Sequence, residues 1–270
     1  MFSPGYGAPR GKRQPARMLT GASGNSPGRR HRHSLEGRIA QRHPRKDNQR
    51  ELTTNIYNLS LRSFRHATGG SSRHRGMIMG LFNTKLVTKT EDEFKAFGGI
   101  PENKSPLKER IGLYWDFLKR PDLDGSDNVP WSAAFVSYMV NLAGANTTFP
   151  YSAQHSVYFY RTINDKAIQK ASAFWGYRVD EVPIEPGDIV GMNRSNKPPI
   201  DYDWAMTHAD YFSHSDIVVA VEGKTIETIG GNVGKAPGEI DRKTFRFAGK
   251  KLQNASKTQE VFVVIKNFLP

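Results

Sequence analysis

The stretch Pro130-Trp131-Ser132-Ala133-Ala134-Phe135-Val136-Ser137-Tyr138-Met139-Val140 decides the fold of this chain. It predicts a loop that ends at Trp131 and an apolar helix that begins at Ser132, runs to about Leu142 and is capped by Gly144. A helix N-terminus offers unpaired N–H groups and the positive end of the helix dipole, which stabilise a developing oxyanion. Ser132 is therefore a candidate nucleophile, and an ordinary N-cap serine is the alternative.

Three downstream motifs extend this pattern: Pro186-Gly187-Asp188-Ile189-Val190, Ser213-His214-Ser215-Asp216-Ile217-Val218-Val219 and Gly230-Gly231-Asn232-Val233. Together with Trp-Ser-Ala-Ala-Phe-Val, in this order, they resemble the CHAP and NlpC-type cell-wall amidases and peptidases, in which a cysteine stands at the place of Ser132. The sequence is most similar to the bacterial domain-of-unknown-function family 2272. The resemblance covers roughly Lys108 to Ala248.

This resemblance implies an α+β, papain-like domain with N-terminal helices packed on a mostly antiparallel sheet. It also implies hydrolysis of amide or peptide bonds in peptidoglycan. Ser132 would attack the carbonyl carbon, His214 would accept its proton, and Asn232 would orient the imidazole. Asp216 and Glu222 are alternative orienting residues. A catalytically inactive papain-like domain that binds cell wall or a protein ligand is the competing interpretation, because serine is harder to activate than a thiol.

Four residues are expected to line the substrate groove: Trp131, His155, Asp188 and Trp204. His155 matches a groove position in the resembled family, although a packing role is the alternative. Trp204 belongs to a long polar and aromatic insert from Arg194 to Phe212. Long inserts are usually functional or disordered, and the aromatic residues favour a flap over the groove.

The remaining pattern predicts helices first and strands afterwards, as in an α+β fold. We expect one helix with Ser105 as its cap and Leu107 to Leu118 on one apolar stripe, and another from Tyr151 to Lys170. Strands are expected at 174–177, 188–192, 216–221, 225–229, 244–247 and 261–265.

The net charge of the 270-residue chain, +13, is concentrated in its first part. Residues 1–76 hold sixteen Lys or Arg against three acidic residues, whereas residues 77–270 hold 23 of each sign. We expect 1–76 to be a disordered basic tail and 77–270 to be the folded domain. The tail could bind anionic polymers non-specifically, act as a targeting segment, or reflect a start codon assigned too early. The neutral domain gives no support for specific nucleic-acid binding.

The composition also limits the chemistry and the compartment. The chain has no cysteine, which excludes a disulfide, a thiolate metal site and a thiol nucleophile. His155, His208 and His214 match no zinc motif, so we expect neither a metal nor another cofactor. With no apolar run long enough for a membrane span and no Sec signal, the sequence predicts a soluble bacterial protein that is cytoplasmic unless a specialised system exports it.

Overall fold

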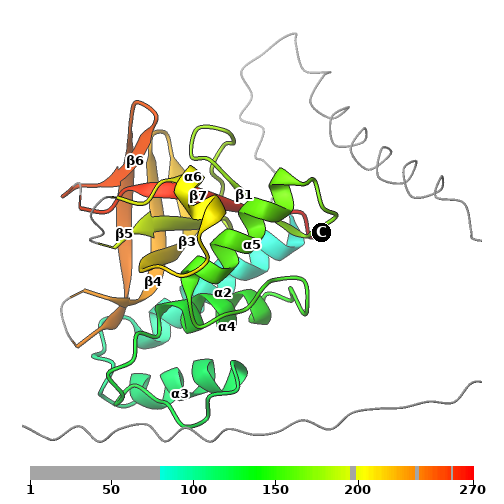
Figure 1. Cartoon of the computed structure of the whole chain (residues 1–270). Helices are drawn as coiled ribbons and strands as arrows, with labels where there is room; N and C mark the ends of the chain where they lie inside the picture. The colour runs from blue at the N-terminus through cyan, green and yellow to red at the C-terminus, as the bar shows by residue number, and fades with distance from the viewer. Residues whose placement is uncertain (1–79, 195–198, 235–236, 257) are drawn as a thin grey trace, which may run out of the picture. The chain divides into compact units, whose positions relative to one another are not determined.

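The computed structural model describes residues 80–194, 199–234, 237–256 and 258–270 (Figure 1). The basic segment expected to be a tail, residues 1–76, lies outside the described residues. The described helices are α2 (Leu81–Phe97), α3 (Leu107–Phe117), α4 (Ser132–Leu142), α5 (His155–Ala167) and α6 (Tyr202–Thr207). No helix among these described residues is long and apolar enough to cross a membrane.

Seven described strands form one antiparallel sheet in the spatial order β1-β7-β2-β3-β4-β5-β6. The strands are β1 (Phe174–Tyr177), β2 (Ile189–Asn193), β3 (Ser213–Glu222), β4 (Thr225–Val233), β5 (Glu239–Ala248), β6 (Lys251–Asn254) and β7 (Val261–Asn267). Four of the described helices precede β1, and α6 lies between β2 and β3. The α+β class expected from the order of helical and strand patterns is confirmed.

The sheet is curled, and each of its two faces packs against a separate apolar core. An isolated bridge between Gln253 and Glu260 joins the end of β6 to the start of β7, although these strands are far apart in the order of the sheet. One face packs against α2, α4 and α5 in the larger apolar core, as Figure 1 shows for the helices beside β3 and β4, and α3 adds to this core by packing on α4. The other face encloses a smaller core that includes Val190, Val218 and Phe245.

Helix α4 lies at the centre of the larger core. Its mean hydropathy is high, and eight of its eleven residues are buried, so it has apolar neighbours on nearly every side. Its N-terminus meets β4 at Gly231, where an added Cβ would come within 2.5 Å of Trp131 and 2.8 Å of Phe135. The second glycine of Gly-Gly-Asn therefore lets the strand approach the residues that flank Ser132.

Sequence pattern and structure differ in four places, one of which is the short helix α6 inside the 194–212 insert, where no helix was expected. Helix α2 was not expected, because its polar sequence buries only four residues. Strand β6 was also missed, since its four residues make up a short edge strand with a single buried side chain. In α3 the N-cap residue is Pro106, and the Ser105 hydroxyl donates to Glu109 Oε2 at 2.7 Å rather than capping the backbone.

Candidate functional site

Helix α4 begins at Ser132, as expected, and no side chain caps it. The Phe135 N–H donates to the Trp131 carbonyl at 2.9 Å and closes the first turn of the helix. Trp131 is fully buried, and its indole N–H donates to Glu102 Oε2 at 2.6 Å. Trp131 therefore fixes the loop that enters α4 and does not line the pocket at Ser132, contrary to its expected groove position.

The side chain that contacts the Ser132 hydroxyl is the imidazole of His155. Ser132 Oγ lies 2.6 Å from His155 Nε2, and both residues are buried, with 2% and 6% of their surfaces exposed. His155 is the first residue of α5, so the pair joins the N-termini of two helices that both pack in the larger core. A hydroxyl within hydrogen-bond distance of an imidazole is the arrangement needed for a serine nucleophile and its base.

The other nitrogen of His155 is held by two hydroxyl groups. Nδ1 lies 2.8 Å from Ser215 Oγ and also contacts Tyr158 Oη, and these two hydroxyls are 2.6 Å apart. Tyr158 lies three residues after His155 on the same face of α5, and Ser215 lies on β3. When Nδ1 carries the proton, its N–H donates a hydrogen bond to one of these hydroxyls, and the unprotonated Nε2 is free to accept from Ser132.

Burial keeps His155 neutral near pH 7. It lowers the pKa of His155 well below its ordinary value, the neighbouring His214 lowers it further, and the carboxylate of Asp216 opposes the shift. Arg194 and Lys243 also lower this pKa. A neutral imidazole can accept a proton, so the group next to Ser132 has the protonation state that a general base requires.

His214 does not contact Ser132 through a hydrogen bond, which corrects the expected nucleophile–base pair. Its Nε2 lies 2.8 Å from Asp216 Oδ1, because side chains two apart on a strand share one face. Asp216 also accepts hydrogen bonds from Thr228 Oγ1 at 3.0 Å and pairs with Lys243 Nζ at 2.9 Å. Lys243 and His214 help to hold the pKa of Asp216 below its usual range despite complete burial. Ser215, one position along, points to α5 instead.

Of the three expected orienting residues, only Asp216 contacts His214. The structure gives no hydrogen bond between Asn232 and His214; Asn232 has a left-handed backbone with φ of 54° at a register shift in β4. Glu222 is exposed at the far end of β3, eight residues from His214. A strand rises about 3.3 Å per residue, so Glu222 is too distant to orient either imidazole.

The first glycine of Gly-Gly-Asn makes room for the His214–Asp216 pair. A Cβ at Gly230 would lie 1.9 Å from Asp216 Oδ1 and 3.2 Å from His214 Nε2. The motif therefore has a packing function at each glycine, and the carboxylate lies where the Gly230 side chain would be.

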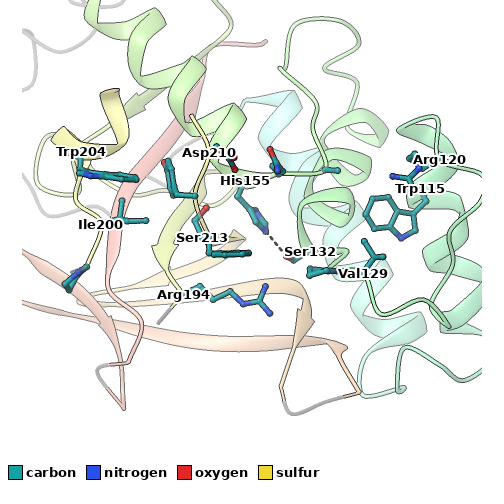
Figure 2. Close-up of a pocket in the computed structure, with 16 residues that line it drawn as sticks. Trp115, Arg120, Val129, Ser132, His155, Arg194, Ile200, Trp204, Asp210 and Ser213 are labelled. Atoms are coloured by element: carbon teal, nitrogen blue, oxygen red, sulfur yellow. Dashed lines mark hydrogen bonds between the residues drawn. The ribbon is translucent and has the colours of Figure 1, made fainter. Parts of the chain in front are cut away.

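Ser132 and His155 line a pocket of about 790 Å³, which we call the Ser132 pocket (Figure 2). Its other lining residues are Trp115, Arg120, Val129, Pro130, Ala153, Gln154, Arg194, Pro199, Ile200, Trp204, Asp210, Tyr211, Phe212 and Ser213. His155 and Trp204, two of the residues expected in a substrate groove, both line this pocket. Much of the 194–212 insert forms one wall, with the Trp204 ring stacked on His208 at a centroid distance of 3.8 Å; residues 195–198 lie outside the described part.

Asp188 lies away from the Ser132 pocket, contrary to its expected groove position. It is fully buried just before β2, where it accepts from Lys266 Nζ at 2.9 Å and from the Glu185 N–H at 2.7 Å. Burial raises its pKa to about 7, and Lys266 opposes that shift. These contacts give Asp188 a structural role at the β2–β7 edge.

The described residues contain no group of three or more His, Cys, Asp or Glu side chains arranged to hold a metal ion. Four polar residues around the site were not expected: Tyr158, Ser215, Lys243 and Arg194. The spacing of three between His155 and Tyr158 was a usable signal, since such residues are neighbours on a helix. The other three are brought close only by the register of the sheet and the path of the insert.

Residues 104–240 match the model of a family described as an uncharacterized protein conserved in bacteria, DUF2272. The chain belongs to this family. The match spans the Ser132 helix, α5, the insert and strands β1 to β4 of the DUF2272 fold, and so includes Ser132, His155, His214 and Asn232. No curated protein and no solved structure matches the chain.

Proposed function

We propose that this DUF2272 protein is a serine hydrolase that cleaves amide or peptide bonds in peptidoglycan. The observation that carries the proposal is the 2.6 Å contact between Ser132 Oγ and a buried, neutral His155, both of which line a large pocket. The order of helix-borne serine and strand-borne His214 with Gly-Gly-Asn, similar to CHAP and NlpC-type enzymes, supports a papain-like relationship and a cell-wall substrate.

The proposed reaction uses His155 as the base. Ser132 Oγ attacks the carbonyl carbon of the scissile amide while His155 Nε2 takes the hydroxyl proton. Backbone N–H groups at the uncapped start of α4 stabilise the oxyanion, together with the positive end of the helix dipole. His155 then passes its proton to the leaving amine. The same imidazole next takes a proton from a water molecule that attacks the acyl carbon, and returns it to Ser132 Oγ as the ester bond breaks.

Ser215 and Tyr158 can accept the hydrogen bond that Nδ1–H donates in the required tautomer of His155, and the buried carboxylate of Asp216 acts from further away. Because Asp216 raises the pKa of His155 against the effect of burial, it favours the imidazolium that forms during attack. His214, between this carboxylate and His155, is placed to orient and polarise the site rather than to deprotonate Ser132.

One observation favours the second candidate, a catalytically inactive binding domain. The groups that contact His155 Nδ1 are neutral hydroxyls, whereas serine hydrolases commonly place a carboxylate there. In this case the Ser132 pocket would bind cell wall or a protein segment without cleaving it.

Release of new amino groups from purified peptidoglycan separates the two candidates. We expect wild type to release them, and Ser132→Ala and His155→Ala each to abolish release, with the double variant no worse than either single one because both residues serve one step. A wild-type protein that binds the polymer without releasing amines would support the binding domain instead.

A further inference from the structure

The Ser132 pocket contains two arginines in different electrostatic situations. Arg120 is paired with Asp122, with Nη2 and Oδ2 2.8 Å apart, so its charge is neutralised on the protein surface. Arg194 forms no ion pair with any acidic side chain in the described parts of the chain, although Asp210 lines the same pocket. Of the two pocket arginines, Arg194 is thus the one without an ion-pair partner among the residues that the structure describes.

Arg194 is also close to the reacting groups. Figure 2 shows its guanidinium end pointing toward Ser132 from the strand side of the pocket, opposite Trp115 and Val129. Its charge lowers the pKa of both His155 and His214, which is consistent with this proximity. The position follows directly after β2, so the end of a central strand fixes its backbone.

Neighbouring residues add uncommitted hydrogen-bond donors and apolar surface. Ser213 Oγ and Tyr211 Oη are buried and have no hydrogen-bond partner among the described residues, and Trp204 supplies a flat ring on the same wall. A guanidinium offers two parallel N–H groups that match a carboxylate, and such pairs are stronger than neutral hydrogen bonds. The wall thus suits a ligand with an anionic oxygen group next to an apolar portion.

We propose that Arg194 determines specificity for substrates that carry a carboxylate on the acyl side of the bond attacked by Ser132. This inference rests on the proposed function, which places the scissile bond at Ser132. A substrate carboxylate would form a bidentate ion pair with Arg194 and hold the carbonyl at Ser132. Neutral acyl groups would enter the same pocket with lower affinity.

Binding to the full-length Ser132→Ala variant tests this without catalysis. Isothermal titration would compare glutaranilic acid, which carries one carboxylate, with its neutral methyl ester. We expect the acid to bind about tenfold or more tightly than the ester, and Arg194→Gln in this background to remove the difference. Arg120→Gln is the matched control, and we expect it to leave the acid-to-ester ratio unchanged. Because every variant keeps residues 1–76, binding to that basic segment cancels in the comparison.

Kinetics on the corresponding 4-nitrophenyl esters separates failure of this inference from failure of the proposed function. Faster turnover of the 4-nitrophenyl ester of glutaric acid than of its methyl-capped analogue, lost in Arg194→Gln through KM, supports both. Turnover of both esters at a ratio that Arg194→Gln does not change overturns the inference alone. If neither ester is cleaved, the titration decides. The inference on Arg194 is overturned if neither ligand binds, or if Arg194→Gln leaves the acid-to-ester affinity ratio unchanged.

Discussion

The imidazole rings of His155 and His214 lie edge to face, with their centroids 5.4 Å apart. His155 belongs to a chain of hydroxyl contacts with Ser132, Ser215 and Tyr158, whereas His214 belongs to an ionic group with Asp216. The two histidines thus connect a neutral network of hydroxyl groups with the charged pair of Asp216 and Lys243. This relationship gives the two residues different functions and leads to the first prediction.

Replacement of either histidine should reduce activity by different amounts. His155→Ala removes the group that accepts the Ser132 proton, and we expect kcat to fall by about 10²- to 10⁴-fold. His214→Ala leaves that contact in place and removes only the ring that lies between His155 and Asp216, so we expect a smaller loss, of about tenfold. Steady-state rates of amine release measure both. Equal losses, or a larger loss for His214→Ala, would show that His214 is the base after all.

The pH profile should extend to lower pH than that of an ordinary histidine. Because the pKa of His155 is lowered, its base form persists as the pH falls, and we expect the acid limb of kcat/KM well below pH 6.5. Removing the positive charge in Arg194→Gln should move this limb to higher pH. Removing the negative charge in Asp216→Asn should move it to lower pH.

The direction of these two shifts is the critical observation, since a change in overall fold would not move the limb in opposite directions. An acid limb that stays fixed in both variants would mean that neither charge acts on the titrating base. An unshifted limb near pH 6.5 in wild type would contradict the burial of His155.

Gly230→Ala should destabilise the protein. The new Cβ would lie 1.9 Å from Asp216 Oδ1, so the carboxylate or the strand must move, and we expect a loss of about 1 to 3 kcal/mol in unfolding free energy. The matched control is Gly112→Ala on α3, where the nearest atom would be 3.7 Å away. Denaturant unfolding compares the two. A Gly230→Ala protein as stable as the control would show that the Asp216 site tolerates a displaced strand.

Asp188 should make stability depend on pH. Its pKa rises from 3.8 to about 7 on folding, so the folded state binds the proton more tightly. The resulting stabilisation is complete below about pH 4 and is lost as the pH rises through 7. We therefore expect the stability of wild type relative to Asp188→Asn to fall between pH 4 and 7, as measured by urea unfolding. A constant difference would mean that Lys266 keeps Asp188 ionised throughout.

Local pattern identified the elements of this fold better than it identified the contacts between them. The helix at Ser132 and its end near Gly144 could be predicted, because capping and apolar spacing are local properties. The strand at β3 followed from its alternating apolar residues. Helix α2 could not be predicted from the sequence, since its stability comes from packing rather than from a strong pattern of its own.

The same limit explains the site. Ser132 and both histidines were recognised as candidates, but Ser132 and His155 are 23 positions apart, and only the packing of α4 beside α5 decides which histidine reaches the hydroxyl. For Ser215, a period of two indicates the face opposite His214, yet it does not say that α5 covers that face. Arg194 directly follows β2, and its place beside the two histidines could be predicted only from the order of the strands in the sheet.

Covalent labelling by a fluorophosphonate tests the central claim, that His155 activates Ser132, most directly. Ser132 Oγ would displace fluoride and gain the phosphonyl group, which intact-mass and peptide mass spectrometry locate. We predict stoichiometric labelling of wild type at Ser132, no labelling of Ser132→Ala, labelling of His155→Ala slowed at least about 100-fold, and labelling of His214→Ala slowed far less. Labelling of His155→Ala at the wild-type rate, or no labelling of Ser132 in wild type, would contradict the claim.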